Sequence, residues 1–188
     1  MPAFALVVVT YVAADDDVAP RLSEGDRRRL DGLRDDAARR RFLAGRAALF
    51  AAAAHAGEPR IRIDARCPDC GLSHGRPTAA GGSLHLALAH AGGRAFAVAS
   101  RRPVGIDAEP VDVSTERRAA IDDLAPGRGD PLRRWTAVEA VLKADGRGLR
   151  VAPDAVRLGF RGAALDGLRY RLRPVREPGF VVTIAEQR

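Results

Sequence analysis

The chain has 188 residues, of which 46% are hydrophobic and 29% are charged, and its formal net charge is +7 at pH 7. This composition is typical of a soluble globular protein with a sizeable core, and the absence of any run of about 18 apolar residues excludes a membrane-spanning helix. No basic segment precedes the apolar residues 3–9, so we expect no signal peptide and a cytoplasmic location.

The first part of the chain predicts a strand followed by helices. The Val-rich residues 4–12 indicate a buried strand, 15–17 an acidic turn, 21–33 a short charged helix and 35–54 a longer helix. The arginines of the longer helix form either a solvated face or a ligand-binding face. Its apolar side consists of Phe42, Leu43, Leu49 and Phe50, and its positive side of Arg39, Arg40, Arg41 and Arg46.

The middle of the chain predicts short strands around an irregular loop. Residues 61–63 alternate as a strand does, and residues 67–77 contain too many Pro, Gly and Cys for regular structure. Residues 84–89 and 95–99 then predict a hairpin, because a Gly-Gly turn within 91–93 joins them.

The second part of the chain repeats this order of elements. A strand is predicted at 103–110, a helix at 114–124 and a Gly/Pro loop at 125–130. Further strands are predicted at 155–160, 168–173 and 180–185. We therefore expect an α+β fold of two similar halves, residues 1–101 and 102–188, each a small sheet packed on a long helix, with the ligand site in the cleft between them.

The helix that follows the loop is the best signalled element of the chain. Asp130 is a good N-cap, Pro131 suits the first helical position, and Gly146 ends the helix. Its apolar stripe consists of Trp135, Val138 and Leu142.

The chain contains a single lysine, Lys143, among 31 basic residues. Glu139 and Lys143 are four residues apart and therefore share one face of the helix. Taken alone, the pair predicts a surface salt bridge worth about 0.2–0.5 kcal/mol. A lone ammonium among arginines also suits a chemical role, because Lys is a compact point charge.

Two acidic residues alternate on the strand at 103–110. Asp107 and Glu109 point to one face, about 6–7 Å apart. Either arginines pair with them on a surface strand, or a divalent cation lies between them, and hard oxygen ligands suit Mg²⁺. Glu139 would supply a third carboxylate and Lys143 a contact to phosphate if the helix packs beside this strand.

The Cys and His residues leave two interpretations open. Cys67 and Cys70, with His74, would provide three zinc ligands, and His85 or His90 would have to complete the site. Otherwise the two cysteines are free thiols. His90 is either a turn residue or a donor to a phosphate.

Two motifs in order resemble the Sfp-type 4′-phosphopantetheinyl transferases, particularly actinobacterial members. They are Gly105-Ile106-Asp107-Ala108-Glu109 and Trp135-Thr136-x-x-Glu139-Ala140-x-x-Lys143-Ala144. His74-Gly75-Arg76-Pro77 is similar to the family's Gly-[Lys/Arg]-Pro loop, and Leu88-Ala89-His90 to its Ser-His segment. Residues 41–46 resemble its Arg-rich helix.

The resemblance implies transfer of the 4′-phosphopantetheine arm of coenzyme A to a serine of an apo acyl or peptidyl carrier protein, with release of adenosine 3′,5′-bisphosphate. It implies a role in polyketide or nonribosomal peptide biosynthesis, with the second half on the metal and pyrophosphate side. From the small size and the duplicated architecture we expect a monomer. Asp107, Glu109 and Glu139 would bind Mg²⁺. The first half would bind the 3′-phosphate and adenine side of coenzyme A, and Lys143 of the second half would also contact coenzyme A. The contacts implied are Arg41, Arg46, Arg76, Pro77, His90 and Lys143.

The chain also departs from the family pattern. Val138 stands where many members have Lys, and Ala89 replaces the usual Ser. Asp122, Asp123, Asp130 or a metal-bound water would have to act as the general base. The alternatives are a non-catalytic member that binds carrier protein or coenzyme A, and a nucleic-acid-binding domain, against which the aromatic content of 5% argues.

Overall fold

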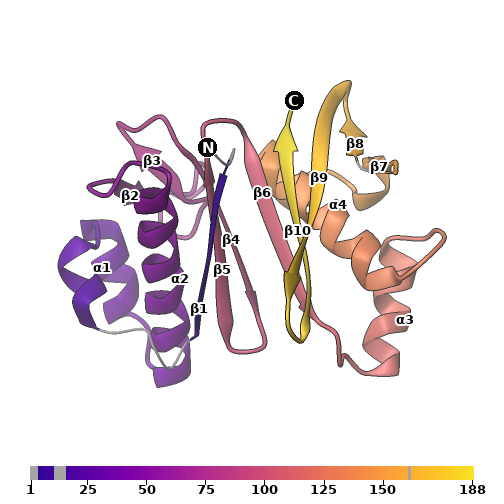
Figure 1. The fold of residues 1–188 in the computed structure, drawn as a ribbon. Helices are drawn as coiled ribbons and strands as arrows, with labels where there is room; N and C mark the ends of the chain where they lie inside the picture. Colours follow the sequence, from indigo (N-terminus) through magenta and orange to yellow (C-terminus); the bar gives the residue numbers. More distant parts are fainter. Residues whose placement is uncertain (1–3, 11–15, 161) are drawn as a thin grey trace. The chain divides into compact units, whose positions relative to one another are not determined.

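The computed structural model describes residues 4–10, 16–160 and 162–188 (Figure 1). The chain divides into two compact units, Met1–Arg101 and Arg102–Arg188, and each contains one five-stranded antiparallel sheet. Tyr11 and Val12 of the first predicted strand, and Asp15 of the predicted acidic turn, lie outside the described residues.

The first unit has the sheet order β1-β5-β4-β3-β2, and α2 packs against β1, β4 and β5. Its hairpin turns where predicted, with positive φ angles of 48° at Gly92 and 74° at Gly93. Strand β3 was not predicted. The elements are β1 (Phe4–Thr10), η2 (Asp16–Arg21), α1 (Glu24–Asp31), α2 (Asp36–His55), β2 (Arg62–Asp64), β3 (Thr78–Ala80), β4 (His85–Ala91) and β5 (Arg94–Ser100).

Helix α2 follows the predicted bounds closely because its start is encoded locally. The Asp35 carboxylate accepts hydrogen bonds from the backbone N–H groups of Ala37 and Ala38 at 3.1 and 3.3 Å. The predicted apolar side of the helix is buried in the core of the first unit, with Leu49 at 0% and Phe50 at 2% exposure.

The second unit has the sheet order β6-β10-β9-β8-β7, and α4 packs against β6, β10 and α3. Strand β8 was not predicted. The elements are β6 (Val104–Pro110), α3 (Thr115–Leu124), α4 (Pro131–Asp145), η3 (Gly148–Arg150), η4 (Pro153–Ala155), β7 (Arg157–Leu158), β8 (Gly162–Leu165), β9 (Leu168–Glu177) and β10 (Phe180–Gln187).

The two units share one topology. In each, the first strand pairs with the last, the remaining strands follow in reverse order, and a long helix follows the first strand after a shorter one. Strands β1 and β6 therefore correspond, as do helices α2 and α4 (Figure 1). The α+β class is confirmed, and the repeated topology is compatible with two similar halves.

Helix α4 begins and ends at the predicted residues. Asp130 accepts a hydrogen bond from the N–H of Leu132 at 3.2 Å, and Gly146 closes the helix with a φ of 92°. Trp135 packs against the core cluster that contains Val138 and Leu142. Among the described residues, no helix is long and apolar enough to cross a membrane.

Candidate functional site

A close approach of helix to strand positions the candidate site of the second unit. A Cβ atom at Gly105 would lie 2.0 Å from the Ala140 carbonyl oxygen and 2.5 Å from the Ala144 nitrogen, so only glycine fits. Because side chains alternate along a strand, Asp107 and Glu109 point to the same face as Gly105, toward α4. Helix α4 thus packs beside this strand, which was the condition for Glu139 to join the two acids.

The predicted Asp107 and Lys143 side chains meet at this contact. Lys143 Nζ donates a hydrogen bond of 2.6 Å to Asp107 Oδ1 and lies 3.8 Å from Glu139 Oε2. Asp107 is 7% exposed, and its other oxygen, Oδ2, is buried without a hydrogen-bond partner. An unmade hydrogen bond at a buried oxygen is costly, so Oδ2 marks a position at which a donor or a cation would be favoured.

Burial dominates the acidity of Asp107. Loss of water around the carboxylate raises its pKa to about 6, the ammonium of Lys143 opposes this rise, and the charges of Glu139 and Glu109 add to it. The two neighbouring carboxylates are thus close enough for Asp107 to respond to their charge.

Glu109 has a partner that sequence reasoning missed. Both of its oxygens accept hydrogen bonds of 2.9 Å from one guanidinium nitrogen of Arg117 on α3. The alternative of a surface strand whose acids pair with arginines is therefore correct in the arginine pairing of Glu109 and wrong in the exposure, because Glu109 is only 8% exposed. The only local signal for Arg117 was its place in a charged helix close after the strand.

The carboxylates fit a hard cation by donor chemistry and by the unpartnered Oδ2. Their oxygens do not converge as a ready-made cage, because Lys143 lies between Asp107 and Glu139 and Arg117 neutralises Glu109. In this structure the ammonium of Lys143 supplies the positive charge next to Asp107 and Glu139. Asp107, Glu109 and Glu139 are the residues that would hold Mg²⁺.

Arg46 differs from its expected role in ligand binding. Its Nε and one terminal nitrogen each donate a 2.7 Å hydrogen bond to Asp26, and the two side chains are 4% and 0% exposed. Its guanidinium also lies 4.8 Å from the centre of the Phe42 ring. As it lies in this structure, Arg46 joins α2 to α1 and is not available to a phosphate.

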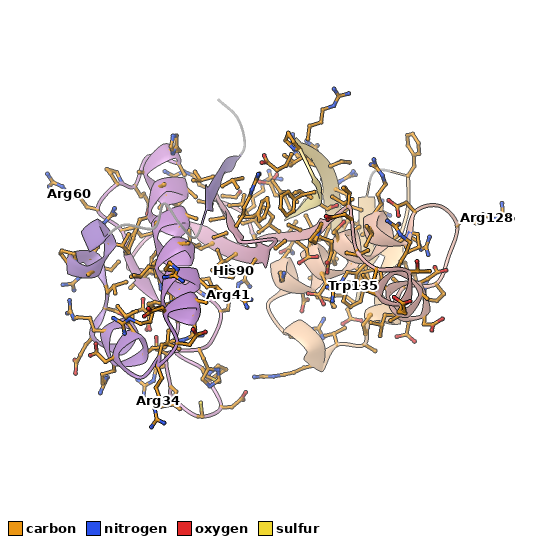
Figure 2. All side chains as sticks on the ribbon, turned by 90° about the horizontal axis from the view of Figure 1, so that it is seen from below. Arg34, Arg41, Arg60, His90, Arg128 and Trp135 are labelled. Atoms are coloured by element: carbon orange, nitrogen blue, oxygen red, sulfur yellow. The ribbon has the colours of Figure 1, made fainter. Side chains whose placement is uncertain are left out.

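Arg41 and His90 lie on neighbouring elements of the first unit. A Cβ atom at Gly45 would lie 3.1 Å from His90 Nε2, so the imidazole ring rests on α2 one helical turn after Arg41. Arg41 is exposed and His90 is half-buried, and both are labelled on the first unit in Figure 2. Both basic side chains thus belong to elements of this unit that pack against each other.

Arg76 and Pro77 end the irregular loop and are both half-buried. The pKa of His85 is lowered by burial and then by the charge of Arg76, which places Arg76 beside β4. His85 is therefore favoured in its neutral form.

Two of the candidates for a general base have structural partners. Asp122 pairs with Arg134, and Asp130 caps α4 and accepts a 2.9 Å hydrogen bond from Arg118. Asp123 is exposed on α3.

The irregular loop gathers Cys67, Cys70 and His74, whose ligand atoms lie within 4.8 Å of one another. This is the one group of three or more such side chains at metal-binding spacing in the described part of the chain, and neither His85 nor His90 belongs to it. The expectation that one of these histidines completes the site is therefore wrong. Hydrogen bonds from the backbone at Cys70 and Asp69 lower the pKa of the Cys67 thiol.

A basic hollow of about 1390 Å³ lies within the first unit. The loop just described forms part of its wall through Leu72, Ser73 and His74. Figure 2 shows the side chain of Arg60 pointing outward from this unit. The arginines that line the hollow are Arg21, Arg27, Arg28, Arg29, Arg60, Arg62 and Arg66.

Comparison with known proteins finds no protein-family model that matches this chain and no matching curated protein.

Proposed function

We propose that the protein is a Mg²⁺-dependent 4′-phosphopantetheinyl transferase that modifies a serine of an apo acyl or peptidyl carrier protein. The observation that supports this most is Asp107, a buried carboxylate with one oxygen on Lys143 and the other without a hydrogen-bond partner. It lies in the first of the two motifs that resemble this family, and the close contact at Gly105 packs this motif against the second one on α4.

The reaction proposed requires charge stabilisation more than covalent participation of the protein. Attack of a serine hydroxyl on a pyrophosphate phosphorus is favoured by in-line positioning and by neutralisation of the phosphate oxygens. When bound by the three carboxylates, Mg²⁺ would neutralise the pyrophosphate. Lys143 supplies an ammonium with three donors, which suits a phosphate oxygen beside the acids that now hold it.

The first unit is assigned to coenzyme A by the resemblance and by its charge. Arg41 is exposed and His90 is half-buried on the neighbouring β4, and Arg76 and Pro77 end the irregular loop. In this proposal Arg46 has a positioning role, because its ion pair with Asp26 fixes the helix that carries Arg41. The net charge of +7 favours association with coenzyme A and with an acidic carrier protein.

The direct test incubates the purified protein with apo carrier protein, coenzyme A and Mg²⁺ and measures the intact mass of the carrier. We expect a gain of one phosphopantetheine group, dependent on Mg²⁺ and absent when the carrier serine is replaced by alanine. No gain on any of several acyl and peptidyl carriers, with folded protein, would contradict the proposal. Calorimetric binding of coenzyme A without transfer or Mg²⁺ dependence would instead favour a binding protein.

Matched variants test the assignment of residues. Asp107→Ala and Glu139→Ala are each expected to abolish transfer while the circular dichroism spectrum stays unchanged. Asp154→Ala removes an exposed carboxylate of the same unit and is expected to keep full activity. Full activity of Glu139→Ala would refute the metal assignment.

A further inference from the structure

The loop between β2 and β3 brings three soft or borderline metal ligands together outside the proposed active site. Cys67, Cys70 and His74 have ligand atoms within 4.8 Å of one another, and Cys70 Sγ lies 2.9 Å from His74 Nε2. Both cysteines are free thiols. In a tetrahedral zinc site with bonds of about 2.0–2.3 Å, the ligand atoms lie about as close to one another as the atoms of this cluster do.

The backbone of the loop is shaped around the first cysteine. The N–H of Gly71 donates to the Cys67 carbonyl at 2.9 Å, and the N–H of Cys67 donates to the Leu72 carbonyl at 2.7 Å. Gly71 has a φ of 72°, which turns the chain back directly after the second cysteine. Backbone groups at Asp69 and Cys70 also hydrogen-bond Cys67, and such outer contacts orient ligands in metal sites.

We propose that Cys67, Cys70 and His74 bind one Zn²⁺ ion, with water in the fourth position. Two thiolates and an imidazole select zinc over the hard cation Mg²⁺, which prefers oxygen ligands. The Cys-x₂-Cys spacing is common in zinc sites, and His74 follows close enough to share the same turn. This site is independent of the transferase proposal, because it uses none of that proposal's residues.

The bound ion would add to the hydrogen bonds that hold the loop at Ser73 and Gly75. Ser73 Oγ donates to Asp26 Oδ1 at 2.9 Å, and the Ser73 carbonyl accepts from Arg29 at 2.8 Å. The N–H of Gly75 donates to the Ala65 carbonyl at 2.6 Å. The zinc site therefore orders the wall of the basic hollow that contains Ser73.

The first experiment measures zinc in the full-length protein, made without a polyhistidine tag, by elemental mass spectrometry. We expect about one zinc ion per chain after dialysis against metal-free buffer. Removal by a chelator and titration with Co²⁺ is expected to produce the visible bands of tetrahedral cobalt together with a thiolate-to-cobalt absorption band. Absence of zinc together with absence of both cobalt signals would overturn the proposal, as would a Cys67–Cys70 disulfide in protein purified under reducing conditions.

Variants locate the ion. Cys70→Ser and His74→Ala change exposed side chains, so the fold is expected to survive, and zinc affinity is expected to fall by more than the roughly 10- to 100-fold typical of changes in outer-shell partners. His55→Ala replaces an exposed histidine of the same unit and is expected to retain the zinc. Unchanged zinc in both ligand variants would place the metal elsewhere and overturn the assignment.

Discussion

Lys143 forms a hydrogen bond with only one of the two oxygens of the Asp107 carboxylate. Its Nζ donates to Oδ1 over 2.6 Å, while Oδ2 is buried without a hydrogen-bond partner. Asp107 and Glu139 share the single ammonium of Lys143, so these two carboxylates together carry more negative charge than the lysine neutralises. This shortage of positive charge makes the site sensitive to pH and to the geometry of the one lysine.

The raised pKa of Asp107 leads us to expect that the free energy of unfolding decreases as pH rises. Its carboxyl has a pKa of about 6 in the folded chain against 3.8 as the ordinary value, so the folded state holds the proton more tightly. The stabilisation is complete below pH 4 and is lost as pH rises through 6, at a cost of about 3 kcal/mol. Asp107→Asn cannot ionise, so its free energy of unfolding should gain by about this amount relative to the parent between pH 4 and pH 7.5.

Urea unfolding of both proteins at a series of pH values measures this difference. Parallel stability curves for the parent and Asp107→Asn would show that burial does not raise the pKa of Asp107 in the folded chain. Added Mg²⁺ is expected to stabilise the parent above pH 6 and to have no such effect on the variant, since the cation binds the ionised form.

Lys143→Arg tests why the chain keeps a single lysine. The planar guanidinium is larger than the ammonium and presents its donors in a fixed fork, so it should misplace the charge between Asp107 and Glu139. We expect transfer activity to fall by roughly 10²-fold with the fold retained. Arg133→Lys, an exchange of the opposite sense at an exposed position of α4, should leave the rate unchanged, and equal rates for both variants would contradict a specific role for Lys143.

Gly105→Ala should destabilise the second unit. The new methyl group would lie 2.0 Å from the Ala140 carbonyl oxygen, and backbone cannot rotate away as a side chain can. We expect a loss of at least about 3 kcal/mol in the free energy of unfolding, measured by thermal and urea denaturation. Gly159→Ala, where the nearest atom is at 3.5 Å, serves as the control and should be close to neutral.

Asp26→Ala should show that Arg46 is structural. It leaves a guanidinium of 4% exposure without its partner, which costs about 3–5 kcal/mol. Arg46→Met combined with Asp26→Leu should recover much of this loss, because the double variant buries no charge. Glu24→Ala breaks the exposed pair with Arg28 and should not change the melting temperature measurably, so equal losses for the Asp26 and Glu24 variants would contradict this interpretation.

Local signals explain what could be predicted from the sequence. Helix α4 was predicted at its true ends because Asp130, Pro131 and Gly146 encode its caps. The two carboxylates of β6 were placed on one face because a strand alternates. Strands β3 and β8 were missed because segments of three and four residues, made mostly of Ala, are too short to show a periodic pattern.

Contacts between distant segments explain what could not be predicted. Arg46 was grouped with the exposed arginines of its helix, because nothing near it in the sequence marks Asp26 as its partner. The pairing of Glu109 with Arg117 and the burial of Asp107 likewise depend on how α3 and α4 pack on the sheet. The motifs indicated which side chains gather, and the packing determines which of them are neutralised.

In each unit a glycine allows the long helix to approach the sheet closely, but this glycine lies on the strand in one unit and on the helix in the other. In the second unit it lies on the strand, where Gly105 meets the backbone of α4; in the first it lies on the helix, where Gly45 meets side chains, with Leu88 at 3.0 Å and the His90 ring at 3.1 Å. A methyl group at position 45 can be absorbed by turning these side chains. Substitution of Gly45 would therefore displace the His90 ring while the fold is retained. Substitution of Gly105 would destabilise the fold itself, because its neighbours are backbone atoms.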